Sequence, residues 1–157
     1  MGFMTDRELL RHTVATLAYR AAKALRDAPD SFATFDAATR PPLSILAHLG
    51  DLIEWATSMA TGERKWREAA PVSWSEECDR FFAEMKKFDD LLASDAPLAC
   101  DMTRLFQGPI ADALTHVGQL AMLRRMAGAG IGGENYFVAE IEVGRVGREQ
   151  AAAKRVF

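Results

Sequence analysis

The sequence has few cysteines and few histidines, and it contains no long hydrophobic run. Two cysteines and three histidines occur among its 157 residues. Cys78 and Cys100 are too few for a disulfide scaffold and lack the spacing of a metal-binding motif. No apolar run reaches the roughly 18 residues of a membrane-spanning helix. The N-terminal stretch through His12 is charged early and has no apolar core, so we expect no secretory signal.

A surplus of basic residues is also lacking. The chain has 19 Lys and Arg against 22 Asp and Glu, which gives a formal net charge of −3. This balance excludes the overall positive charge that attracts nucleic acid. The scarcity of cysteine suits a reducing cytoplasm. We therefore expect a single domain over residues 1–157, cytoplasmic, with neither nucleic acid nor membrane as a partner.

What the sequence does contain is helical periodicity in four stretches. Apolar residues recur every three to four positions over about 6–27, 42–59, 73–92 and 109–126. No strand pattern is strong enough to build a sheet. We therefore predict an all-α four-helix bundle followed by a less regular C-terminal tail over 136–157.

Local signals mark where these helices begin and end. Thr5 with Glu8 and Ser73 with Glu76 have the spacing of capping boxes, and Gly62 is a helix stop. We expect Gln107-Gly108-Pro109 to separate a short helical turn over 101–106 from the helix that follows. Pro109 would then lie in the first turn of that last helix.

Two of the three histidines fall within the central helices, His48 in the second and His116 in the fourth. Asp112 precedes His116 by four positions, which places both side chains on one face of the helix. If these two helices pack together, two imidazoles and a carboxylate converge. That donor set binds divalent transition metals and leaves coordination positions open. We therefore predict that His48, Asp112 and His116 are metal ligands.

Other roles for these residues stay open on the sequence alone. His48 could be a hydrogen-bonded core residue, and Asp112 could cap a helix that begins at Pro109. In a metal-free site, Asp112 would bridge His48 and His116 by charge-assisted hydrogen bonds. The third histidine, His12, follows Arg11 on the first helix, and we expect it at the surface rather than as a fourth ligand.

Polar neighbours could support the predicted ligands. Asp51 lies on the same helix face as His48 and could accept an imidazole N–H or form a surface salt bridge. Gln119 follows His116 by three positions and could hold that imidazole in the same way. Trp55 also lies on the face of His48. No further residue stands out as an acid or a base.

Three sequence elements together resemble one known family. They are the histidine within LAHLGDLIEWA (46–56), the His-x-Gly-Gln element within DALTHVGQLAMLRRMAG (112–128), and GGENYF (132–137). With the order and length of the helices, they are similar to the DinB/YfiT-like family of metal-binding four-helix bundles over essentially the whole chain. The resemblance implies one ligand from the second helix and an H-x3-H pair from the fourth. His48 and His116 match that set, and Asp112 replaces its third histidine.

The resemblance also implies a function. We expect a divalent ion as cofactor, zinc or nickel, with iron or manganese favoured by the carboxylate as alternatives. Members with known activity are thiol-dependent transferases, isomerases or hydrolases, and dimers are frequent. We therefore expect a homodimeric, metal-dependent enzyme that uses a low-molecular-weight thiol against a small electrophile, or reacts by metal-assisted hydrolysis. The alternative is a non-catalytic, stress-associated metal-binding or structural bundle.

Overall fold

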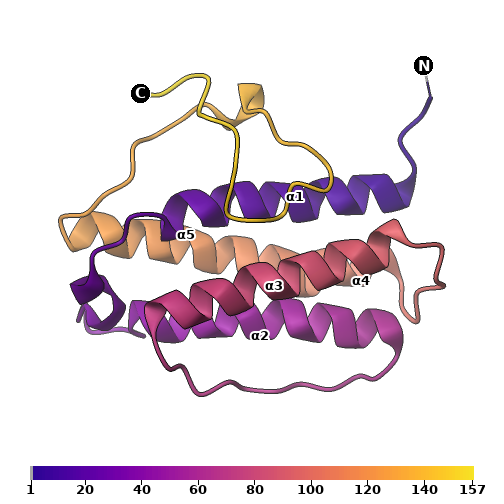
Figure 1. The fold of residues 1–157 in the computed structure, drawn as a ribbon, viewed down its shortest axis with the longest axis horizontal. Helices are drawn as coiled ribbons and strands as arrows, with labels where there is room; N and C mark the ends of the chain where they lie inside the picture. The colour runs from indigo at the N-terminus through magenta and orange to yellow at the C-terminus, as the bar shows by residue number, and fades with distance from the viewer. Residues whose placement is uncertain (1) are drawn as a thin grey trace.

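The structure is a computed structural model that describes residues 2–157, and four long helical segments dominate it (Figure 1). The first three are α1 (Asp6–Leu25), α2 (Pro42–Thr61) and α3 (Trp74–Ala93). The fourth comprises α4 (Met102–Leu105), the π-helical turn η2 (Phe106–Ile110) and α5 (Ala111–Met126). Two short 3₁₀ segments are η1 (Asp30–Thr34) and η3 (Tyr136–Val138). This architecture confirms the prediction of an all-α four-helix bundle.

The four helices form a ring in which α1 and α2 each pack against both α3 and α5. In Figure 1, α1 and α5 run in one direction, and α2 and α3 run in the other. Because α2 and α3 are parallel neighbours, the connection over 62–73 has to return along the length of the bundle. This long connection passes beneath α2 in the view of Figure 1.

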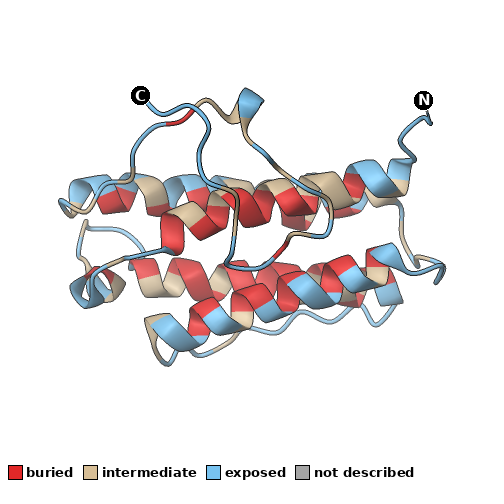
Figure 2. Ribbon diagram, turned by 45° about the horizontal axis from the view of Figure 1, so that its top comes forward, coloured by how far each residue is buried: buried red, intermediate tan, exposed pale blue. Residues whose placement is uncertain are grey.

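The core lies between these helices, and their buried faces point inward (Figure 2). Helix α2 is buried on most of its circumference, as its apolar sequence predicts. None of the helices within residues 2–157 has the length and apolar character that a membrane crossing requires. The largest side chains of the core are fully buried and include Phe32, Phe81, Phe88, Leu17, Leu46 and Leu49.

The predicted break at Gln107-Gly108-Pro109 is wrong, because the helix continues from Met102 to Met126 through η2. Proline lacks an N–H group, and its ring clashes with the carbonyl four residues earlier in a regular α-helix. The wider π turn accommodates Pro109 without ending the helix. Asp112 therefore lies inside a continuous helix, and its side chain caps no backbone N–H group. The capping role considered for Asp112 is thereby excluded.

The other helix signals are confirmed, with one difference in detail. Thr5 and Glu8 form a complete capping box at the start of α1. Ser73 accepts from the backbone N–H of Glu76, but the Glu76 carboxylate accepts from the Ser73 hydroxyl instead of the Ser73 backbone. Gly62 ends α2 with a φ of +87°, a conformation that glycine adopts without strain.

The C-terminal tail crosses the outer face of α1 (Figure 1) and is largely irregular, as predicted. Glu134 attaches the start of this segment to α1, because its buried carboxylate accepts from the Tyr19 hydroxyl at 2.9 Å and from Lys23 at 3.3 Å. Glu134 also forms an isolated antiparallel bridge with Val156 near the end of the chain. Val146 is buried and adds an apolar contact.

Candidate metal centre

His48 of α2 and Asp112 and His116 of α5 come together on one side of the bundle. One ligand atom from each residue lies within 4.8 Å of the other two. The Oδ2 atom of Asp112 is 3.8 Å from His48 Nε2, and its Oδ1 atom is 3.4 Å from His116 Nε2. The two imidazole rings meet edge to face, with centroids 4.8 Å apart. Among residues 2–157, no other group of three His, Cys, Asp or Glu side chains converges in this way.

These distances fit a shared divalent ion. Donor atoms that lie about 2.1 Å from one tetrahedral ion are about 3.4 Å from each other. The carboxylate–imidazole distances of 3.4 and 3.8 Å are close to that value, but they run to different carboxylate oxygens, and the donor set as a whole lies within 4.8 Å. Small rotations of the side chains would therefore bring all three donors onto one ion. Two imidazoles and a carboxylate also form a donor set that divalent transition metals accept. The Asp112 side chain is 49% exposed, so the centre opens to solvent on that side.

The hydrogen bond of His116 decides which of its nitrogens can bind an ion. His116 Nδ1 lies 2.8 Å from the Gln119 side-chain oxygen Oε1. Because an amide oxygen only accepts, Nδ1 carries the proton in this hydrogen bond, and Nε2 is the nitrogen that faces Asp112. This contact confirms the hydrogen bond between Gln119 and His116 that the spacing predicts.

The metal-free alternative requires hydrogen bonds that the structure does not contain. The 3.8 Å separation between His48 and Asp112 is too long for a hydrogen bond, and the 3.4 Å contact between His116 Nε2 and Asp112 lacks hydrogen-bond geometry. Asp112 therefore lies between two imidazoles without bridging them by hydrogen bonds.

The electrostatics around His48 favour its neutral form. Burial lowers the pKa of His48, and the neighbouring His116 and Arg40 lower it further, while Asp112 and Asp51 act in the opposite direction. A neutral imidazole is the form that binds a metal ion. The surroundings of His48 therefore suit ligation at neutral pH.

Asp51 does not support His48 as the sequence suggested, because it faces α3 instead. Its buried carboxylate pairs with Arg80 at 3.0 Å and accepts from the Ala69 backbone N–H at 3.3 Å. Arg80 also donates to Glu77 at 2.9 Å. Gly50 allows this close approach, since a Cβ atom there would lie 2.6 Å from the guanidinium carbon. Asp51 thus forms a salt bridge, which was the second role left open by the sequence, but the pair involves a buried carboxylate instead of lying at the surface.

Trp66 borders the centre, and sequence reasoning missed it. Its ring centroid lies 5.7 Å from that of His48 and 5.9 Å from that of Trp55, and it meets both rings edge to face. The long connection that carries Trp66 has no periodic pattern from which its position could be predicted. The one available signal was a tryptophan within the strongly polar segment GERKWRE (62–68). Trp66 joins this connection to the histidine of α2.

The third histidine and the cysteines take no part in the centre. His12 lies on α1 and is not one of the converging residues. Cys78 is buried in the core, and burial raises the pKa of its thiol to about 11, which suits an unreactive apolar residue. Cys100 is half-buried, and burial also raises the pKa of its thiol.

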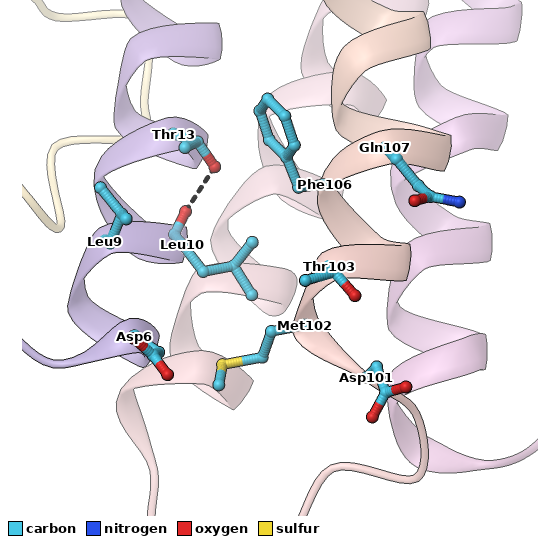
Figure 3. A pocket seen from close by; sticks show the side chains of 9 residues that line it. All are labelled: Asp6, Leu9, Leu10, Thr13, Asp101, Met102, Thr103, Phe106 and Gln107. Carbon is cyan, nitrogen blue, oxygen red and sulfur yellow. Dashed lines mark hydrogen bonds between the residues drawn. The ribbon is translucent and has the colours of Figure 1, made fainter.

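One cavity of the structure lies away from these residues. It has a volume of about 660 Å³ and lies between the N-terminal half of α1 and the segment formed by α4 and η2 (Figure 3). Leu10, Met102 and Phe106 line it with apolar groups, and its ionisable residues are Asp6 and Asp101. This lining offers no metal-binding group of three and no histidine, so the cavity supplies less chemistry than the histidine centre.

Comparison with family models, with curated proteins and with solved structures finds no match to this chain. Function is therefore inferred from the centre itself.

Proposed function

We propose that this chain is a divalent-metal-binding protein in which His48, Asp112 and His116 hold the ion. The observation that carries this proposal is the convergence of two imidazoles and a carboxylate at distances that suit one ion. Zinc or nickel fits the two nitrogen donors, and the carboxylate also admits iron or manganese. The resemblance of the helix-two and helix-four motifs to the DinB/YfiT-like family supports the same ligand positions.

Each ligand has a distinct part in holding the ion. Gln119 orients His116 through its Nδ1 proton, burial keeps His48 neutral, and the Asp112 carboxylate offsets part of the positive charge. Three protein donors leave coordination positions open, whereas structural zinc sites usually have four protein ligands. A divalent ion bound here supplies Lewis acidity that favours the thiolate form of a low-molecular-weight thiol. Because members of the DinB/YfiT-like family, which the chain resembles, include such enzymes, we propose a thiol-dependent transferase, isomerase or hydrolase.

A non-catalytic role is the second candidate, and one observation favours it. The three ligands come from two neighbouring helices, so an ion would cross-link α2 to α5 and stabilise the bundle. Thermal unfolding with and without chelator, together with turnover assays on thiol substrates, separates the two candidates. A large loss of stability on chelation without any turnover would favour the structural role.

Titration of metal-free, untagged protein with zinc tests the binding proposal directly. We expect one ion per chain in the wild type and at least about a 100-fold loss of affinity in His116→Ala, because a ligand is removed. His12→Ala is the matched control, since this histidine lies outside the centre. The proposal is wrong if His116→Ala binds zinc as tightly as the wild type.

A further inference from the structure

A second cavity is lined by α5, by Ile45 near the start of α2 and by the connection that precedes α2. Its volume is about 540 Å³. We call it the methionine groove, after two of the residues that line it. Its wall includes Thr39, Ile45, Gln119, Met122, Leu123 and Met126.

The methionine groove lies about one helical turn from the centre because of the way the two helices run, although none of the three proposed ligands lines it. Ile45 precedes His48 by three residues, and Gln119 follows His116 by three. Since α2 and α5 are antiparallel, both residues lie about one turn from their histidines in the same direction. Gln119 belongs to both features, because it lines the groove and also accepts from His116 at 2.8 Å.

The lining of the groove suits an apolar chain. Met122 and Met126 are 54% and 56% exposed and lie one turn apart on α5, so they form a contiguous apolar surface along the groove. Methionine is flexible and polarisable, so it adapts to ligands of different shape. Gln119 already bonds to His116, so the groove offers few free polar partners to a sugar or a peptide. Its volume lies within the range of about 300–1,000 Å³ of small-molecule sites.

A positive charge lies where the groove approaches the centre. Arg40 follows the lining residue Thr39, is exposed, and forms no ion pair within residues 2–157. An anionic group at the Thr39 end of the groove would therefore lie near an unpaired cation.

We propose that the methionine groove binds the apolar chain of an amphiphilic small molecule whose anionic head lies at the His48–Asp112–His116 centre. The position of the head rests on the metal site proposed above, whereas the position of the chain rests on the groove alone. The ligand class is thus an acid or thiolate with an alkyl or aryl body, in contrast to a wholly polar substrate.

Saturated hydroxamic acids of two to eight carbons test this proposal, because their head binds metal and only their chain varies. The readout is the ¹³C-methyl NMR spectrum of the methionines, of which the chain has seven. We expect saturable shifts at Met122 and Met126 in the zinc-loaded protein. The Kd should fall about two- to fourfold for each added methylene. Met102, which lines the cavity beside α1, should not respond.

Two lysine variants supply the matched comparison. Met122→Lys places a charge in the groove, and Leu9→Lys places one in the cavity beside α1, at a position that is also 54% exposed. We expect the chain-length dependence to disappear in Met122→Lys and to persist in Leu9→Lys. A Kd independent of chain length, a response at Met102 instead of Met122, or equal effects of the two variants would overturn the proposal.

The same titration without zinc separates this inference from the proposed metal site. If Met122 and Met126 still shift without zinc, but the hydroxamic acids bind more weakly than they do with zinc, both the groove and the metal centre are supported. If zinc does not bind, and long chains still bind better than short ones at Met122, the groove stands and the metal proposal fails. If zinc strengthens all chain lengths equally and Met122 never shifts, the metal proposal stands and the groove proposal fails.

Discussion

The imidazole of His116 donates from Nδ1 to Gln119 over 2.8 Å, which leaves Nε2 free on the side of Asp112. His48 presents its own Nε2 to the other carboxylate oxygen at 3.8 Å. A single amide oxygen thus selects the tautomer that a metal ion requires. At the residue scale, the proposed metal centre depends on the Nδ1 proton of His116 as much as on the three ligands.

Replacement of Gln119 tests the value of this hydrogen bond. Gln119→Ala should lower zinc affinity about 10- to 100-fold, because His116 loses the group that fixes its tautomer and orientation. Isothermal titration with zinc measures the effect. Gln107→Ala is the control, since Gln107 is exposed on the same continuous helix and does not contact His116. Equal affinity in the two variants would show that Gln119 does not hold the imidazole.

The lowered pKa of His48 predicts how the stability of the metal-free protein depends on pH. The unfolded chain binds a proton near the ordinary value of 6.5, and the folded chain binds it only at lower pH. Between those values the unfolded state holds more protons, so stability is full above about pH 6.5 and falls as the pH drops. Urea unfolding at pH 7.5 and 5.0, with chelator present, should show this loss in the wild type.

Two histidine variants isolate the contribution of His48 to that loss. His48→Gln should lose less stability between pH 7.5 and 5.0 than the wild type, because the titrating group is gone. His12→Gln should behave like the wild type, since this histidine lies on α1 outside the centre. The interpretation fails if His48→Gln retains the full pH dependence.

Helical spacing predicts relations within one helix better than relations between helices. The pair Asp112 and His116 and the support from Gln119 follow from positions on one helix, and the structure shows both contacts. The sequence left two roles open for Asp51 and did not identify its partner, because Arg80 lies on another helix that the local pattern does not reveal. Trp66 was missed for a similar reason, since an irregular connection has no period that places its side chains.

At the scale of elements, one half-buried cation, Arg80, links the parallel helices α2 and α3. Arg80 of α3 pairs with Asp51 at 3.0 Å and Glu77 at 2.9 Å, and donates to the Ala47 carbonyl of α2 at 2.6 Å. Asp51 and Glu77 are both buried, and burial raises the pKa of Asp51 against the opposing effect of Arg80. Loss of this arginine would leave two carboxylates in the interior without their cation.

Arg80→Ala should therefore destabilise the fold by about 3–5 kcal/mol, the usual result of breaking one side of a buried ion pair. Arg67→Ala is the matched control, because Arg67 pairs with Glu54 at 3.3 Å but its side chain is 65% exposed. Removal of such an exposed pair should cost less than about 1 kcal/mol. Urea unfolding measures both variants, and a similar small effect in both would contradict the importance assigned to Arg80.

The π turn shows where local rules fail at this scale. A Gly-Pro pair ordinarily ends a helix, and the sequence predicted a break there. The helix instead continues, because α4, η2 and α5 all pack against α1 or α2 and retain their contacts when one turn widens around Pro109. Tertiary packing of these segments thus outweighs the helix-breaking tendency of Gly108-Pro109.

At the scale of the whole molecule, Glu134 joins the C-terminal segment to the bundle. Its buried carboxylate meets Tyr19 and Lys23 of α1, and its backbone bridges to Val156. Burial and the Glu134 acceptor raise the pKa of Tyr19 to about 12, so the hydroxyl remains a donor well into the alkaline range. This contact holds both ends of the tail against α1.

Glu134→Gln should loosen the tail, because it removes the charge that Lys23 faces and weakens the bond from Tyr19. We expect faster amide hydrogen exchange over 136–157 and a loss of about 1–3 kcal/mol in stability. Glu140→Gln is the control, since Glu140 is exposed and pairs with the exposed Lys154. Unchanged exchange in Glu134→Gln would show that other contacts hold the tail.

Helical periodicity was sufficient to predict four helices and an irregular tail, but not their arrangement. An apolar stripe shows that a helix is buried without showing which neighbour covers it. The parallel direction of α2 and α3 became visible only with the long return of residues 62–73 along the bundle. The meeting of His48 with Asp112 depends on that arrangement, so the sequence alone made it a hypothesis.

Long-range ¹H–¹⁵N NMR of the imidazoles during zinc titration tests the central claim most directly, because the chain has three histidines. One equivalent of zinc should shift the Nε2 resonances of His48 and His116, leave Nδ1 of His116 protonated, and leave His12 unchanged. Unchanged nitrogen resonances at His48 and His116 in the presence of excess zinc would contradict the proposed metal centre.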